Sequence, residues 1–154
     1  MSKAALKRAD LQLGSAWTGK KREGKTAQVI KTLGRIQGDP CVVASVERVD
    51  HVGHKHDLYG LFDLLVIYQD RTVGVQVCGS DWGAHIKLYK GERLPNARRW
   101  LDCPSREFQM WGWRKLKRRG KGVWIPRVQQ ITPEFLRGDS EPKMLDELSE
   151  IFEP

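Results

Sequence analysis

Residues 57–78 read DLYGLFDLLVIYQDRTVGVQVC. Two apolar runs flank a short polar loop at 69–71, and this pattern predicts a β-hairpin. Asp63 enters the first run, while Gln76 and Cys78 lie in the second. A carboxylate in an apolar strand is costly to bury unless it meets a cation, a metal ion or hydrogen-bond donors. Asp63 therefore marks either an exposed sheet edge or a functional site.

The composition fits one compact globular domain. The chain has 154 residues, of which 40% are hydrophobic and 30% are charged, and this length allows a real core. No apolar run approaches the roughly 20 residues of a membrane helix, and the first residues lack the apolar core of a secretory signal. We therefore expect a cytoplasmic protein without membrane contact. The three cysteines are scattered without a CxxC pair, which argues against a disulfide framework or a zinc site.

The charge is basic and unevenly distributed. The net charge is +8, but the segment from Thr132 to the end holds seven acids and two bases, so the first 131 residues carry about +13. A basic body of this kind suits a polyanion, and DNA is the partner that we expect. The alternative is a basic protein without such a partner.

The hairpin lies within an alternating series of helices and strands. Helical spacing and β-branched runs predict helices at 25–36, 82–89 and 94–101, and strands at 41–49, 107–113 and 123–131. The order αβββαβ predicts an α/β fold, in which helices flank a mixed central sheet. Its first three strands form an antiparallel meander, and a helix crosses over before the next strand. We expect a flexible basic arm at 1–24, a domain at 25–131 and an acidic helical tail at 132–154, with a helix cap at Thr132 and a second helix at 143–152.

The hairpin also suggests a divalent metal site. A hard cation prefers oxygen ligands, and the Asp63 carboxylate, the Gln76 amide oxygen and the Val77 carbonyl would form half of a magnesium shell. Glu47 and Asp57 lie close in sequence and could add charge. Such a metal can activate water and stabilise a reacting phosphate. The alternatives are that Asp63 caps a turn and that Gln76 is a satisfied core amide.

The segment 50–56 carries three of the four histidines, His51, His54 and His56. Histidine is a common metal ligand, but the segment offers no matching fourth ligand. We therefore favour a solvated loop over a metal site.

The element order, with Asp63 opening the second strand and Gln76-Val77-Cys78 on the third, resembles the PD-(D/E)xK nuclease superfamily. Its restriction-endonuclease-like fold also occurs in archaeal Holliday junction resolvases. The resemblance is closest to small phage and prophage proteins that share an Asp-Leu-Tyr/Phe-Gly-x-x-Asp motif, a Val-Gln-Val strand, a Gly-Trp-Arg-Lys run and a basic turn. The matching segments are 57–66, 75–78, 112–115 and 118–122.

This resemblance implies a nuclease that hydrolyses phosphodiesters of DNA with Mg²⁺ or Mn²⁺. Asp63 matches the metal-binding aspartate, but Gln76 stands where an acid is usual and Cys78 where a lysine is usual. Lys87 on the following helix would replace the lysine, and Glu47 would restore the carboxylate. The candidate catalytic residues are therefore Asp63, Gln76, Cys78, Lys87 and Glu47. Many relatives act as dimers, so a homodimer is a possible assembly.

The two departures also support a second reading, in which the protein keeps the fold as a catalytically degenerate DNA-binding or regulatory module. A third reading is an interaction factor whose acidic tail docks on a basic surface.

A basic turn provides the candidate DNA surface. Between Trp111 and Arg127 there are seven bases, no acids and three tryptophans. Alternation places Trp111 and Trp113 on one face of a strand, where we expect them to pack in the core. Basic side chains neutralise phosphates. The candidate DNA contacts are Arg98, Arg99, Arg114, Lys115, Lys117, Arg118, Arg119 and Lys121.

Overall fold

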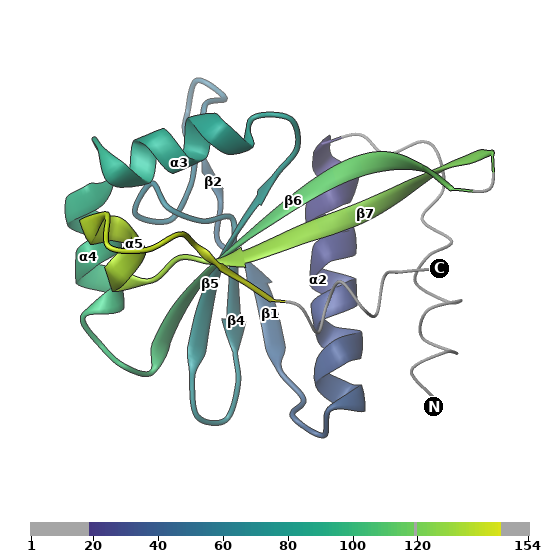
Figure 1. Ribbon diagram of the computed structural model, residues 1–154, viewed down its shortest axis with the longest axis horizontal. Helices are drawn as coiled ribbons and strands as arrows, with labels where there is room; N and C mark the ends of the chain where they lie inside the picture. Colours follow the sequence, from purple (N-terminus) through teal and green to yellow (C-terminus); the bar gives the residue numbers. More distant parts are fainter. Residues whose placement is uncertain (1–18, 119, 146–154) are drawn as a thin grey trace.

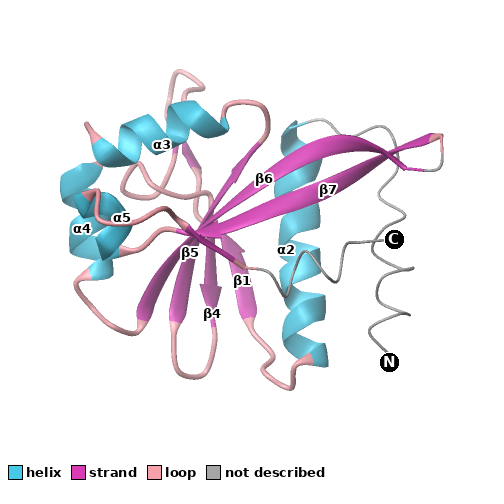
Figure 2. Ribbon diagram, viewed as in Figure 1, coloured by secondary structure: helices cyan, strands magenta, loops and turns pink. Residues whose placement is uncertain are grey.

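The protein folds into a six-stranded mixed sheet with helices on both faces (Figures 1 and 2). The computed structural model describes residues 19–118 and 120–145. Figure 1 shows helix α2 on one side of the sheet and helices α3, α4 and α5 on the other. The predicted α/β class and flanked mixed sheet are confirmed. Within the described residues, no helix combines the length and apolarity needed to cross a membrane.

The sheet contains one parallel pair among antiparallel neighbours. Its order is β1-β4-β5-β6-β7-β8, and only β5 and β6 run parallel. The strands are β1 (Val42–Ser45), β4 (Leu64–Ile67), β5 (Thr72–Cys78), β6 (Arg106–Arg118), β7 (Lys121–Gln130) and β8 (Lys143–Met144). Helices α3 (Trp82–Lys90) and α4 (Leu94–Leu101) connect the parallel pair. The predicted meander and crossover are therefore confirmed.

Helix α2 (Gly19–Ile36) begins earlier than the predicted start at Lys25. Its inward face carries Val29, Ile30 and Leu33, which are buried against the sheet. Gly38 adopts a φ of 73° after the helix, a left-handed conformation that commonly ends helices. The predicted arm at 1–24 is thus wrong for residues 19–24, which are helical, whereas 1–18 lie outside the described residues.

The predicted first strand at 41–49 is divided. β1 ends at Ser45, and β2 (Arg48–Val49) pairs with β3 (Lys55–His56) in a separate two-stranded sheet. The Asp50 carboxylate accepts hydrogen bonds from the backbone N–H groups of Val52 and His54, and these bonds fix the turn between the two short strands. The predicted loop at 50–56 is therefore a small hairpin.

The strand that contains the first apolar run begins at Leu64, one residue after Asp63, which we expected to open it. Residues 57–61 form tight turns, in which Tyr59 has a φ of 55° and Gly60 a φ of 67°. Asp63 comes directly before the strand. The Gly60 peptide N–H donates to the Asp57 carbonyl, which closes the turn.

Two cores hold the layers together. One lies between α2 and the sheet and includes Trp111 and Trp113, both buried as predicted. The other lies between the sheet and helices α3 to α5, where Phe62 packs against Trp100 and Phe108. Gly74 makes room for the Phe62 ring, because an added Cβ would overlap it.

The C-terminal segment belongs partly to this second core. Thr132 caps α5 (Pro133–Arg137) through a hydrogen bond from the Phe135 N–H, as predicted. The predicted helix at 143–152 is wrong at its start, because Lys143 and Met144 form β8 and pair with β7. Residues 146–154 lie outside the described residues.

The hairpin of β6 and β7 extends as an arm beyond the rest of the sheet. Gly112 lies level with Cys78, the last residue of β5, so residues 113–126 continue past the end of that strand. Figure 1 shows the arm reaching beyond α2. The strands continue to Arg118 and resume at Lys121. The predicted basic turn at 114–122 is therefore mostly strand.

Candidate functional site

Asp63 lies at the junction of three strands. Its N–H donates to Val75 of β5, and its carbonyl accepts from the Val46 N–H just after β1. Its carboxylate accepts hydrogen bonds from the Gln76 amide at 3.0 Å and the Val77 N–H at 2.9 Å. Only 7% of the residue is exposed. Asp63 is thus a buried, anchored carboxyl rather than an exposed edge residue.

The environment of Asp63 favours its protonated form. Burial raises its pKa to about 9, and hydrogen bonding and charge repulsion from Asp57 act in the same direction. The Val77 N–H opposes this shift because it stabilises the ionised form. This environment therefore favours the protonated form of Asp63, whose carboxyl hydrogen-bonds to Asp57.

Gln76 serves as a structural amide in this arrangement. Its Nε2 donates to Asp63 and to the Val77 carbonyl, at 3.0 and 3.2 Å. Its oxygen accepts from the buried Tyr89 hydroxyl at 3.4 Å. The amide oxygen, proposed as a metal ligand from the sequence, thus points to Tyr89 and away from the carboxyl.

A polar cavity of about 190 Å³ opens beside Asp63. Five segments line it: the first turns of α2, Glu47 between β1 and β2, the short strand β3, Asp63 before β4, and the end of β5 with the residues that follow it. Its charged lining residues are Arg22, Glu23, Glu47, Lys55, Asp63 and Asp81. The end of β5 contributes Val77, Cys78 and Gly79.

A second carboxyl pair accompanies Asp57 and Asp63. Burial raises the pKa of Glu47, Lys55 opposes that shift with its charge, and a hydrogen bond with Glu23 raises the pKa further. The Lys55 Nζ lies 3.6 Å from Glu47, and Glu23 accepts from the Ser45 hydroxyl at 2.7 Å. The cavity therefore concentrates acids, and the pKa values of two of them, Glu47 and Asp63, are raised.

Cys78 reaches this cavity, but its surroundings disfavour the reactive thiolate. Burial raises the pKa of its thiol to about 12, with further contributions from the charges of Asp81 and Asp63. The nucleophile of cysteine chemistry is the thiolate, which this environment disfavours. Cys78 packs in the second core.

The basic side chains that line the cavity are not the lysine that the sequence suggested. Lys87 is exposed on α3 and does not line it, whereas Lys55 and Arg22 do. Lys55 was missed because its segment has the pattern of a histidine-rich loop. Arg22 and Glu23 were missed because they fell in the predicted arm. The available signal was spacing, since Glu23, Thr26, Ile30 and Leu33 share one helical face.

Carboxylates, which line this cavity, are the ligands that a hard divalent cation prefers. A nearby cation stabilises the ionised form of carboxyls with a raised pKa, such as Asp63 and Glu47, and metal binding is coupled to loss of their protons. Within the described residues, no group of three or more His, Cys, Asp or Glu side chains is arranged to hold a metal. Waters would therefore have to complete a shell begun by two carboxylates.

The histidine segment is held by a carboxylate. The Asp50 carboxylate lies 2.9 Å from His56 and 3.6 Å from His54. These contacts stabilise the turn of the small hairpin, in keeping with the solvated segment that we favoured.

The candidate DNA residues occupy two separate places. Arg114, Lys115 and Lys117 are exposed on the arm. The side chains of Arg118, Arg119 and Lys121 lie outside the described residues. Arg98 and Arg99 are exposed on α4, at the end of the molecule opposite the arm (Figure 1). They therefore do not extend the basic surface of the arm.

The base of the arm adjoins the cavity. Trp113 donates to the Thr26 hydroxyl at 2.7 Å, and Thr26 donates to the Arg22 carbonyl one turn earlier. Arg127 lies opposite Gly112 and stacks over the Trp82 ring at 4.6 Å. Arg127 also lowers the pKa of Cys78 by its charge, although burial outweighs it. The arm and the carboxylate cavity thus form one continuous region.

Comparison of the chain with protein-family models, curated proteins and solved structures gives no match.

Proposed function

We propose that this protein is a metal-dependent DNA nuclease with a restriction-endonuclease-like fold. The observation that carries the proposal is the buried Asp63 carboxyl, which faces a cavity of further acids at the base of a basic arm. Clustered carboxyls suit a hard cation, and exposed lysines and arginines suit a phosphate backbone. Together they suit a reaction at a phosphodiester.

The topology supports the same proposal. An antiparallel meander, a helical crossover and a fourth strand parallel to the third follow the order that the sequence resemblance implied. Asp63 precedes the second strand of this meander, next to the end of the third. The strand order supports the proposed fold. A fold by itself does not specify an activity, so the proposed activity rests on the cavity.

Each group at the cavity has a role suited to its chemistry. A bound Mg²⁺ or Mn²⁺ would supply charge stabilisation at the phosphate and a more acidic water. Asp63 and Asp57 would hold it, with the Val77 carbonyl beside them. Lys55 and Arg22 add positive charge next to these acids, where a phosphate would approach. The basic side chains of the arm would hold the DNA against the cavity mouth.

The proposal is tested by cleavage with an isosteric variant. Asp63→Asn keeps the shape of the side chain and removes its charge, while Asp102→Asn makes the same change on an exposed residue at the end of α4. Wild type and Asp102→Asn should cleave plasmid, branched or single-stranded DNA with Mg²⁺ or Mn²⁺, and Asp63→Asn should not. Equal background activity of wild type and Asp63→Asn on all substrates would reject the nuclease.

A second candidate function is a DNA-binding module that has lost catalysis. The donating amide of Gln76 and the thiol of Cys78 favour it, because neither supplies the charge that the resemblance would require. DNA binding in EDTA should then survive in Asp63→Asn and fall with increasing salt. Absence of cleavage together with such binding selects this candidate over the first.

A further inference from the structure

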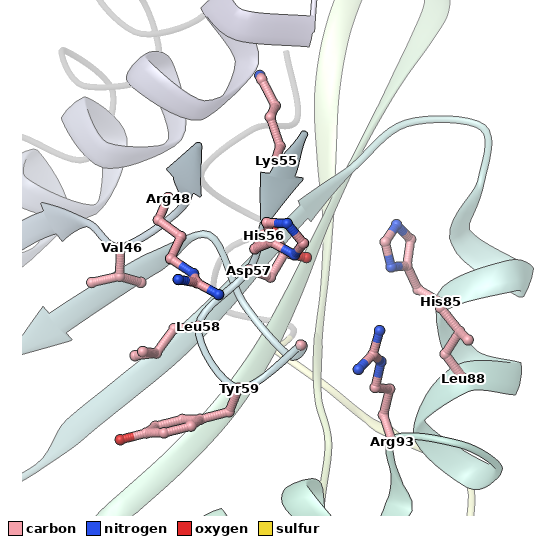
Figure 3. A pocket seen from close by; sticks show the side chains of 11 residues that line it. Val46, Arg48, Lys55, His56, Asp57, Leu58, Tyr59, His85, Leu88 and Arg93 are labelled. Carbon is pink, nitrogen blue, oxygen red and sulfur yellow. The ribbon is translucent and has the colours of Figure 1, made fainter. Parts of the chain in front are cut away.

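A second cavity lies beside the carboxylate cavity, on the side of α3. Its volume is about 430 Å³. The small hairpin of β2 and β3, the turn at 57–60 and the α3–α4 segment surround it (Figure 3). Lys55 lines both cavities, and Asp57 lines this one while it hydrogen-bonds to Asp63 in the other. A ligand that fills this cavity would therefore be a direct neighbour of one at Asp63.

Arg93 lines this cavity, and one of its guanidinium N–H donors has no hydrogen-bond partner within residues 19–118 and 120–145. Its Nε is buried and has no hydrogen-bond partner among the described residues. The guanidinium lies against Gly60, where an added Cβ would come within 2.6 Å of Nη1. Only the missing side chain of Gly60 leaves space for it. A buried, unsatisfied donor is unfavourable, and an acceptor that binds beside it stabilises it.

The residues that line the cavity carry more positive than negative charge. Figure 3 shows Arg48 and Arg93 pointing into it from opposite sides. Neither arginine is within ion-pair distance of a carboxylate in the described part of the chain. Asp57 is the one carboxylate among the described lining residues, which also include the cations Arg48, Lys55 and Arg93. The unbalanced charge selects an anion.

Two histidines of the lining are held in place by carboxylates that lie outside it. His56 contacts Asp50 and His85 contacts Asp81, each through Nε2 at 2.9 Å. Both rings also line the cavity. Guanidinium groups that face each other match the oxygens of a phosphate better than a single point charge does.

An exposed tyrosine stands at the mouth of this cavity. Tyr59 is 61% exposed, and its φ of 55° is unusual for a bulky residue. The Asn96 side chain donates to the Tyr59 carbonyl at 2.9 Å and helps to hold this turn. Such strained positions concentrate at ligand sites, and an exposed aromatic ring can stack on a base.

We infer that this cavity binds a phosphate group of a DNA strand, with Arg48 and Arg93 on the phosphate and Tyr59 on the adjacent base. The choice of DNA rests on the proposed function, whereas the preference for phosphate rests on the cavity. The bound phosphate is the neighbour of the one that faces Asp63. The cavity therefore sets which linkage of the strand reaches the carboxylates.

Binding without cleavage tests this inference. Fluorescence anisotropy of a labelled single-stranded oligonucleotide in EDTA gives the dissociation constant of each variant. Arg48→Ala should bind about tenfold more weakly, and the salt dependence should lose about 0.7 of its logarithmic slope. Arg93→Lys keeps the charge but removes the planar fork, so it should also bind more weakly. Arg35→Ala, an exposed arginine in the last turn of α2, is the control and should bind as wild type does.

Two oligonucleotides distinguish the source of the phosphate. If an internal linkage fills the cavity, Arg48→Ala weakens binding of 5′-phosphorylated and 5′-hydroxyl strands equally. If a terminal phosphate fills it, only the phosphorylated strand is affected. Either result supports the phosphate site, and thermal unfolding of each variant shows that the fold is intact.

Unchanged affinity and unchanged salt slope in both arginine variants would overturn the inference. Its failure is separate from that of the proposed function. Cleavage that depends on Asp63, together with normal binding by both variants, removes only the phosphate site. Arginine-dependent binding without any cleavage removes only the nuclease.

Discussion

The proton on Asp63 is a consequence of its burial. A carboxyl that is 7% exposed and lies beside Asp57 is disfavoured in its charged form, and two hydrogen-bond donors do not offset this. Its pKa is about 9 in the folded protein and near the ordinary value of 3.8 in the unfolded chain. Between these values, the folded state holds a proton that the unfolded state releases. The free energy of unfolding therefore falls as pH rises through this window.

Asp63→Asn should stabilise the protein at pH 8 in EDTA. Asparagine can accept the bonds from Gln76 and Val77 and donate to Asp57, and it has no proton to lose. The advantage over wild type should be largest near pH 8 and disappear near pH 4, at roughly 1.4 kcal/mol for each pH unit at most. Urea unfolding at several pH values measures it, with Asp102→Asn as control. A less stable Asp63→Asn at pH 8 would contradict the assigned protonation.

Lys55 rather than Lys87 should assist the reaction. Lys55 lies 3.6 Å from Glu47 in the cavity lining, whereas Lys87 is exposed outside it. Removing a cation from a site of phosphate charge typically costs at least tenfold in rate. Initial rates of DNA cleavage should therefore fall at least tenfold in Lys55→Ala and stay within about twofold in Lys87→Ala. The reverse order would assign the role to α3.

The arm is the element that places positive charge next to the cavity. Beyond the end of β5, β6 continues as a two-stranded ribbon with β7. Side chains alternate along β6, so Arg114 faces solvent while Trp113 packs in the core beside α2. The parallel register fixes the base of the arm at the level of Cys78. The register of two strands thus determines where the basic side chains begin.

Removing charge from the arm should weaken DNA binding more than removing it from α4. The double variant Arg114→Ala and Lys117→Ala should bind a DNA duplex more weakly, and its salt slope should fall by about 0.9 for each lost phosphate contact. Arg98→Ala with Arg99→Ala removes the same charge at the opposite end of the molecule (Figure 1). Anisotropy titrations at several salt concentrations compare the two pairs. Equal losses in both pairs would show that net charge, and not the arm, determines binding.

The molecule as a whole includes the first part of the segment that sequence composition assigned to an acidic tail. Phe135 and Leu136 of α5 are buried in the second core, with Ile131 before them. Deleting residues 132–154 would therefore open this core. The effect of this deletion on binding would therefore not test whether the tail has an interaction role. A shorter deletion that leaves α5 in place is needed for that test.

Phe135→Ala should destabilise the protein by about 3–5 kcal/mol, the usual cost of emptying a buried aromatic site. Ile67→Ala changes a half-exposed residue on β4 and should cost less than about 1 kcal/mol. Urea unfolding of both variants measures the difference. A cost for Phe135→Ala no larger than that for Ile67→Ala would show that α5 is not part of the cooperative unit.

Local patterns were sufficient for much of the fold. Helix α4, the Thr132 cap, the hairpin of β4 and β5 and the buried tryptophans of β6 follow from spacing between near neighbours. Errors arose where a distant partner decides the structure. Lys143 and Met144 became a strand because β7 offers them a free edge, and residues 19–24 became helical where α2 continues against the sheet.

The sequence by itself determined that Asp63 is unusual, because a carboxylate in an apolar run is costly wherever the chain folds. It also determined the basic character of the β6–β7 hairpin. Only the tertiary structure decided which charged residues surround Asp63. Glu23, Glu47 and Lys55 line the same cavity, and Asp57 hydrogen-bonds to Asp63. The segments that carry these residues have no fixed separation along the chain. It also decided that Gln76 donates and that Lys87 lies elsewhere. Spacing along a chain fixes contacts within one helix or hairpin, but contacts between elements depend on how the layers pack.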